Sequence, residues 1–304
     1  MLAYIGRRAS HSIVSVIGLL ALVFFLTRLT GDPSALYLPL DSTQEARAAF
    51  AKLHGFDQPI YWQFWEYLRN LLHLDFGESV RQNRSAMAVA LQAFPQTLKL
   101  AFVAMILSTV LAVLVGALAA SRPGGIFDRF VTIISLAGAS APDFWVAIVA
   151  ILIFAVGLDL LPTSGTGTLL HWVMPIFVLT LRPFGLLVQV VRGTMLGALA
   201  SPYIKTAKAK GVSRYRIIFG HALRNSLLPV VTVAGDLATS LVNGAVVVES
   251  VFGWPGIGKL MIDAIIQRDF AVVQSTILVT ATAIFVLNII IDLLYAALDP
   301  RIRY

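Results

Sequence analysis

Cysteine is absent from the 304-residue chain, and only five residues are histidine. The lack of cysteine excludes disulfides, thiolate metal sites and thiol catalysis. No two histidines have the spacing of metal ligands, and no Ser–His–Asp set or carboxylate pair is visible. We therefore expect no metal, no cofactor bound by this chain and no enzymatic activity of its own. The histidines are His11, His54, His73, His171 and His221.

Charged side chains are also scarce. They make up 13% of the chain, against 58% for hydrophobic residues, and the mean hydropathy is +0.83. A soluble chain of this length usually carries about a quarter charged residues, so the composition is that of a membrane protein. The net charge of +7 does not indicate nucleic-acid binding, because the basic residues gather in the loops between apolar runs.

The sequence contains several long runs of apolar residues. Runs of about 20 residues predict transmembrane helices, and six of them give an all-α membrane protein with six transmembrane helices. The third and fourth are interrupted by Pro142, Asp143 and Arg182. The predicted spans are Ser10–Leu29, Pro95–Ala120, Phe130–Gly157, Trp172–Leu196, Leu227–Val251 and Ala271–Ala297.

The longest polar stretch, Thr30–Phe94, separates the first two spans. It predicts a small folded cap with short helices near Thr43–Leu53 and Pro59–Leu72. We therefore expect residues 1–94 to form the first span plus this cap, and residues 95–304 to form the core transmembrane domain. Amphipathic rings prefer the membrane interface, which is where we expect Trp62, Phe64, Trp65 and Tyr67.

Lysine and arginine gather in the loops on one side of the predicted spans, where only Asp128 and Asp299 offset them. In the loops on the other side, acidic residues balance the basic ones. By the positive-inside rule the first side is cytoplasmic. Both termini are then cytoplasmic, and the cap is extracytoplasmic.

The densest basic stretch is Ser201–Pro229, between two apolar runs. Ser201 suits a helix N-cap, Pro202 suits the first helical position and Gly211 suits a helix stop. These residues predict a short helix near residues 202–211. A positive loop that only fixes topology would explain the composition equally well, but it would not explain the order of the residues.

The order of the residues in this loop resembles a known signature. The sequence YIKTAKAKG, followed by HALRNSLLPVVT, is similar to the cytoplasmic loop of binding-protein-dependent ABC importer permeases. More narrowly, it resembles the first permease of the dipeptide/oligopeptide/nickel group. The glutamate that marks this loop in the wider family is absent here, as is usual for the subgroup. The resemblance covers essentially the whole chain, because further motifs follow in the family's order: YIGRR, Gly31-Asp32-Pro33, Leu74-Asp75-Phe76-Gly77, ESVFGWPGIG and Asp299-Pro300-Arg301.

The resemblance implies a type I ABC importer permease fold whose short cytoplasmic helix couples to a separate ATPase subunit. Tyr203, Ile204 and Ala207 share a helix face and are expected to dock in a cleft of that subunit. The lysines would pair with acidic residues around the cleft or with lipid headgroups. The expected coupling residues are Tyr203, Ile204, Lys205, Thr206, Ala207, Lys208, Ala209, Lys210 and Gly211.

The resemblance also implies partners in the bacterial inner membrane. They are a homologous second permease subunit, two cytoplasmic ABC ATPases that hold ATP and magnesium, and a periplasmic solute-binding protein. The binding protein is expected to meet the cap and the loop that contains Glu249, Trp254, Pro255 and Gly256.

Among the charges within the predicted spans, Arg182 lies in the fourth span and Asp236 in the fifth. Such charges are costly unless they are paired or functional. Two hypotheses remain open. Arg182 and Asp236 form a structural ion pair, or Arg182 faces the translocation path and meets a substrate carboxylate while Asp236 orients it.

The loop Gly253–Leu260 matches most of the phosphate-binding pattern G-x-x-x-x-G-K-[ST]. Leu260 replaces the hydroxyl that would hold magnesium, and no strand precedes the loop. We interpret it as a turn after the fifth span, with Trp254 at the membrane interface.

The leading cargo is a di- or oligopeptide, and nickel chelates or glutathione-type peptides are the alternatives. A rival of another class is a secondary transporter or channel that has no ATPase, and a membrane enzyme comes third. The sequence contains a docking loop that these rivals do not need.

Overall fold

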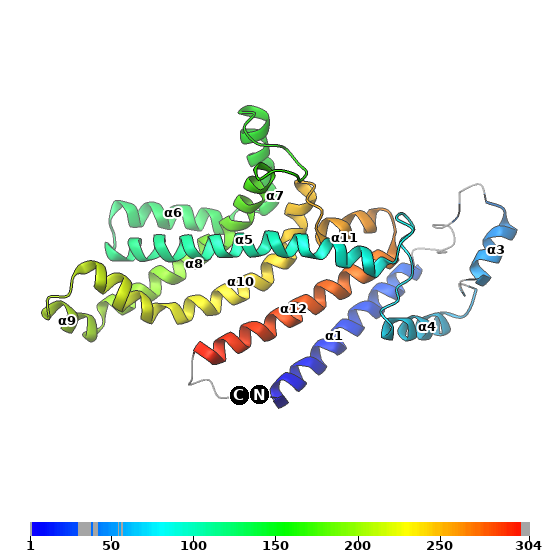
Figure 1. Ribbon diagram of the computed structural model, residues 1–304, viewed down its shortest axis with the longest axis horizontal. Coiled ribbons are helices and arrows are strands. Elements are labelled where there is room, and N and C mark those ends of the chain that lie inside the picture. Colours follow the sequence, from blue (N-terminus) through cyan, green and yellow to red (C-terminus); the bar gives the residue numbers. More distant parts are fainter. Residues whose placement is uncertain (1, 30–37, 39–41, 54, 56, 299–304) are drawn as a thin grey trace. The chain divides into compact units, whose positions relative to one another are not determined.

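A computed structural model describes residues 2–29, 38, 42–53, 55 and 57–298, and most of them lie in helices (Figure 1). Within these ranges there is no strand beyond an isolated bridge between Glu78 and Ser85. The predicted all-α class is confirmed. The elements are α1 (Leu2–Leu29), α3 (Gln44–Leu53), α4 (Ile60–Leu72), α5 (Ala86–Ser121), α6 (Ile126–Ser140), α7 (Asp143–Ala150), η1 (Ile151–Gly157), α8 (Leu170–Ala200), α9 (Pro202–Ala209), η2 (Arg216–Ala222), α10 (Leu223–Val251), α11 (Ile257–Ile266) and α12 (Phe270–Leu298).

Four of the described helical segments are long and apolar enough to cross a membrane: α5, α8, η2 with α10, and α12. The helix α6 and the segment α7–η1 make a fifth span if the bent pair counts as one. The helix α1 contains a shorter apolar stretch, Ile13–Leu26. These elements follow the order of the six predicted spans.

The third predicted span is broken rather than straight. Its two halves, Ile126–Ser140 and Asp143–Gly157, are bent by 105°. Ala141 and Pro142 between them have extended backbone, with ψ of 132° and 133°. Proline lacks an N–H group and disfavours helical backbone in the residue before it. Pro142 therefore ends α6 and lets α7 leave in a new direction.

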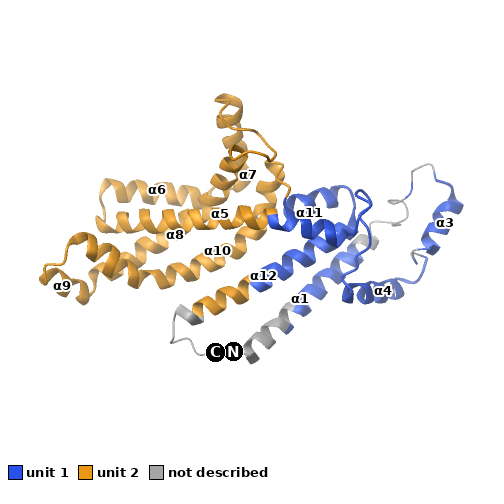
Figure 2. Cartoon of the chain, viewed as in Figure 1, with its two compact units in different colours: residues 1–95, 256–286 blue, residues 96–255, 287–304 orange. Residues whose placement is uncertain are grey.

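The chain divides into two compact units (Figure 2). The described parts of residues 1–95 and 256–286 form unit 1, and those of 96–255 and 287–304 form unit 2. The helices α5 and α12 contribute to both.

In unit 1, small buried apolar side chains pack α11 and the start of α12 against the start of α5. Ala86, Ala264 and Val272 share one buried cluster. The side chain of Asp269, 3% exposed, accepts hydrogen bonds from the Ser79 hydroxyl at 2.5 Å and from the Val272 amide at 3.3 Å. A carboxylate before the first turn of α12 satisfies helix N–H groups that have no partner within the helix.

In unit 2, α8 is the central helix and packs on both α6 and α10. Gly185 allows the close approach to α6, because a Cβ atom there would overlap the Ser135 carbonyl oxygen. One apolar cluster surrounds Val188 and Val191 of α8, and a second surrounds Met174 nearer the start of that helix.

Candidate functional site

The helix α9, Pro202–Ala209, forms where the sequence predicts it, starting at the predicted residue and ending two residues earlier than predicted. Ser201 holds the N-cap position with extended backbone, but its hydroxyl donates to the Ala198 carbonyl at 2.5 Å instead of accepting from α9. At the other end Gly211 has φ of +74°. The Gly211 amide donates to Lys208 O at 3.0 Å, and the Val212 amide donates to Ala207 O at 3.1 Å. This pair of bonds is the glycine-dependent helix stop known as the Schellman motif.

The two faces of α9 have different surroundings. Ile204 is 0% exposed and belongs to the same apolar cluster as Val191 of α8, with Ala207 packed against that cluster. Tyr203 is 42% exposed. The other expected coupling residues that are exposed are Lys205, Thr206, Lys208, Ala209, Lys210 and Gly211.

This arrangement corrects one expectation. Ile204 is not available to dock in another subunit, because its side chain fills the interior of unit 2. The helical spacing correctly places Ile204 and Ala207 on one face, but that face is turned inward. Tyr203 is the aromatic residue of α9 that stays accessible.

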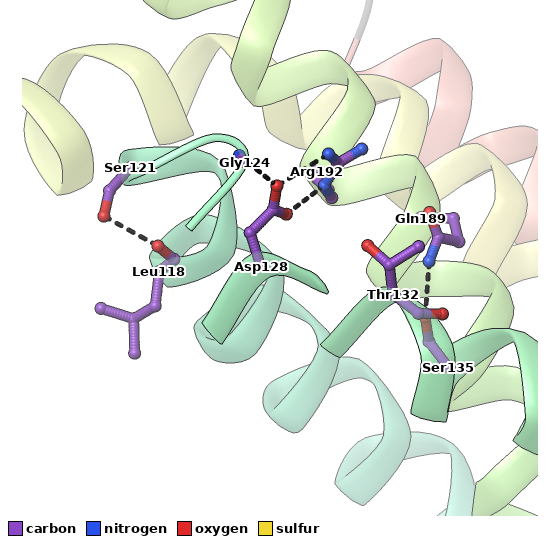
Figure 3. A network of polar contacts seen from close by, with 8 residues as sticks. All are labelled: Leu118, Ser121, Gly124, Asp128, Thr132, Ser135, Gln189 and Arg192. Atoms are coloured by element: carbon purple, nitrogen blue, oxygen red, sulfur yellow. Dashed lines mark hydrogen bonds and ion pairs between the residues drawn. The ribbon is translucent and has the colours of Figure 1, made fainter. Parts of the chain in front are cut away.

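A bidentate ion pair in unit 2 joins α8 to the start of α6 (Figure 3). Arg192 of α8 donates from Nε to Asp128 Oδ1 at 2.5 Å and from Nη2 to Asp128 Oδ2 at 2.9 Å. The Gly124 amide donates to the same carboxylate at 2.8 Å. Asp128 is 2% exposed. Bidentate pairs of this kind fix geometry as well as charge.

A second polar contact joins the turn between α5 and α6 to the residues that follow α9 in the sequence. Arg214, which follows α9, donates from Nη2 to the Ser121 carbonyl at 2.7 Å. The segment 121–128, which joins α5 to the first turn of α6, is therefore bonded to α8, which precedes α9, and to the loop that follows α9. From the sequence alone, Asp128 is expected only as a charge in a loop. The one available signal was a lone acid in an otherwise basic loop.

The intramembrane charges are not brought together. Neither Arg182 nor Asp236 takes part in an ion pair within 4.0 Å, so a direct pair between these two described residues is not present. Arg182 is exposed and interacts electrostatically with Asp143, at the bend between α6 and α7. Asp236 lies on an exposed stripe of α10 with Thr232, Ser240 and Asn243.

The turn after α10 is mostly buried, which corrects the placement of Trp254 at the membrane interface. Trp254 is 1% exposed, donates from Nε1 to the Gln96 carbonyl at 3.2 Å and meets the Trp172 ring edge-on at 4.6 Å. Glu249 is 0% exposed and accepts from the Thr97 hydroxyl at 2.5 Å. Gly256 is buried and Pro255 is exposed.

Neither a nucleotide loop nor a metal centre emerges from these elements. The helix α10, not a strand, precedes the Gly253–Leu260 turn. Among the described residues, no group of three or more His, Cys, Asp or Glu side chains is placed to hold a metal ion.

Comparison with known proteins defines the class. The model of the family described as "Binding-protein-dependent transport system inner membrane component" matches residues 112–304, and the chain belongs to this family.

Several relatives match along their whole length. The oligopeptide transport system permease protein AppB of Bacillus subtilis is 37% identical, with 100% of both chains covered. The di/tripeptide permease DppB of Pseudomonas aeruginosa is 38% identical, and the dipeptide permease DppB of Escherichia coli is 36% identical. Each of these two comparisons covers 100% of this chain and 99% of the relative.

Solved structures share the fold. The MetNI methionine ABC transporter, in an inward-facing form, matches with a TM-score of 0.60 at 20% identity, over 70% of this chain and 97% of the other. An amino acid ABC transporter solved with histidines matches with a TM-score of 0.52 at 14% identity, over 71% and 94%.

Proposed function

We propose that this chain is the membrane-spanning permease of an ATP-driven importer that carries di- or oligopeptides across the bacterial inner membrane. The full-length relatives named for peptide transport support this cargo. In this scheme the chain is not an enzyme. Two cytoplasmic ATPase subunits bind ATP and magnesium, while a second, homologous permease and a periplasmic solute-binding protein complete the transporter.

The observation that carries the proposal is the two-sided character of α9. Its inner face is fixed in the core by Ile204, while its outer face presents Tyr203 and the three lysines. A loop that only fixes the membrane topology would not need a short helix with one buried face and one exposed face. The helix α9 is suited to move with a partner subunit as a rigid body and to transmit that motion to the transmembrane helices.

The polar contacts of unit 2 extend that rigid body. When the ATPases close on ATP, motion of α9 reaches α8 directly through the packing of Ile204. It reaches the α5–α6 turn through the Arg192–Asp128 pair and the Arg214–Ser121 bond. Hydrolysis then resets the permeases.

The exposed stripe of α10 is proposed to face the translocation path or the second permease. Polar and charged side chains within a span avoid lipid and face protein or water. Asp236 is in this stripe, where it would attract the protonated amino group of a peptide. Arg182 beside Asp143 is the candidate contact for a peptide carboxylate.

On the periplasmic side, the cap and the exposed Pro255 are proposed to meet the solute-binding protein. Glu249 and Trp254 would shape this turn from inside rather than touch the partner, because both are buried. Both termini would be cytoplasmic, on the same side as α9.

Reconstitution tests the proposal against its rivals. The chain, its candidate second permease, the ATPases and the binding protein would be placed in liposomes with labelled dipeptides, oligopeptides, glutathione or nickel chelates outside. We expect peptide uptake that needs ATP and the binding protein. Uptake of nickel or glutathione alone would favour the alternative cargo. Uptake without any ATPase would establish the secondary-transporter reading instead.

A substitution pair isolates the role of α9. Tyr203→Ala removes the accessible ring of α9 and is expected to lower ATP-driven uptake without loss of the folded protein. Tyr215→Ala is the control, because Tyr215 is 74% exposed in the same loop but lies outside α9. Equal uptake by both variants would remove Tyr203 from the proposed contact.

A further inference from the structure

The helix α4 has apolar residues around most of its circumference. At about 100° per residue, Tyr61, Trp62, Trp65 and Leu72 fall within one arc of roughly 100°. Their exposed fractions are 74%, 45%, 68% and 83%. The polar residues Gln63, Glu66 and Asn70 occupy a separate, narrow sector. The exposed aromatic rings of α4 therefore form one contiguous apolar patch and are not scattered singly over the surface.

A different sector of α4 is packed against α1. Phe64 lies with its ring centroid 5.3 Å from that of Phe24 and 5.2 Å from that of Phe25, and Tyr67 stacks on Phe24 at 5.1 Å. Burial against α1 raises the pKa of the Tyr67 phenol. These contacts fix α4 firmly to one level of α1.

That level coincides with the end of the apolar stretch of α1. The apolar stretch of α1 is Ile13–Leu26, and Phe24 and Phe25 stand at its end. The exposed apolar surface of α1, which includes Leu22 and Leu26, reaches this level. Trp and Tyr are the residues that prefer the membrane–water interface.

We propose that α4 is an interfacial helix whose Tyr61–Trp65–Leu72 face lies on the lipid headgroup region, continuous with the lipid-facing surface of α1. Arg69, exposed between Trp65 and Leu72 in the same arc, extends its guanidinium to lipid phosphates, as long basic side chains do at interfaces. Of the four rings that the sequence places at the interface, Phe64 and Tyr67 hold the helix in place, while Trp62 and Trp65 meet the lipid. It does not depend on the proposed transport function.

The lack of native cysteine makes the test direct. Trp65→Cys and Leu72→Cys, each in the full-length chain, would be labelled with bimane and assembled in lipid nanodiscs. Asn70→Cys is the matched control, because Asn70 is exposed on the polar sector of the same helix. Each sample would be measured with and without phosphatidylcholine that carries a shallow acyl-chain spin label, so that quenching by nearby tryptophans cancels.

We expect the labels at positions 65 and 72 to lose most of their fluorescence to the spin-labelled lipid and the label at position 70 to lose little. Labels at 65 and 72 that are quenched by aqueous iodide and not by the lipid would overturn the proposal, because the face would then lie in water. Labels quenched by neither agent would also overturn it, because a protein partner would then cover the face.

Discussion

At the scale of single residues, the carboxylate of Asp128 links α6 to α8 in the unit that contains α9. Asp128 accepts three hydrogen bonds, two from Arg192 and one from the Gly124 amide, while it is 2% exposed (Figure 3). A buried charge without its partner is costly, so each member of such a pair requires the other. The Arg192 side chain is 26% exposed, which moderates that cost because solvent screens the arginine.

A double-mutant cycle measures this coupling. Asp128→Asn and Arg192→Gln are each expected to destabilise the protein by on the order of 1–3 kcal/mol, and the double variant by less than their sum. Thermal unfolding of the detergent-solubilised protein gives the values. The matched control is the cycle of Lys259 and Asp263, a partly exposed pair one helical turn apart, where we expect a coupling of about 0.3–0.5 kcal/mol. Simple additivity at Asp128 and Arg192 would contradict the account.

At the scale of elements, the spans pack through small residues. The helix α8 meets α6 at Gly185, where a Cβ atom would overlap a backbone oxygen, and backbone cannot turn aside as a flexible side chain can. Gly193 on the same helix has no heavy atom within 4 Å of the position of a Cβ. Both glycines lie within one predicted span and look alike in the sequence, but only Gly185 lies against the backbone of another helix.

The substitutions Gly185→Ala and Gly193→Ala separate these roles. Gly185→Ala is expected to force α6 and α8 apart and to lower the free energy of unfolding by about 1–3 kcal/mol, as overpacking usually does. Gly193→Ala is expected to be neutral or to stabilise the protein by up to about 1 kcal/mol, because alanine favours the helix. Both are read from thermal unfolding. A Gly185→Ala protein as stable as the parent would refute the close contact.

The order and type of the elements were predictable from the sequence. Hydropathy located the spans, and the helix start and stop signals at Ser201, Pro202 and Gly211 located α9 within two residues. The directions of side chains were not predictable. Ile204 and Trp254 are apolar residues that suit lipid, a partner or a core equally well, and only the tertiary structure assigns them to the core.

Contacts distant in sequence were missed for a related reason. Asp128 and Arg192 are 64 residues apart, and no local pattern links them. Conversely, the sequence favours a pair of Arg182 and Asp236 because both are charges well inside predicted spans, yet Arg182 interacts electrostatically with Asp143 instead. The bend of 105° at Pro142 brings Asp143 into a position that a straight span would not give it.

At the scale of the whole molecule, the chain is one member of a family of membrane components that work with other proteins. The central claim is that α9 is the point at which an external ATPase drives these spans. This claim places α9 on the cytoplasmic side and in contact with a second polypeptide. It also requires that the contact be needed for transport and not only for assembly.

Site-specific cross-linking at α9 tests this claim most directly. Lys208→Cys would be the only cysteine in the chain, at an exposed position of α9, and would be paired with single cysteines in the cleft of the ATPase subunit. The account predicts a disulfide between the two subunits that stops ATP-driven uptake, and uptake that returns when the disulfide is reduced. Labelling of Lys208→Cys by an impermeant reagent from the periplasmic side, or full uptake with the cross-link in place, would contradict it.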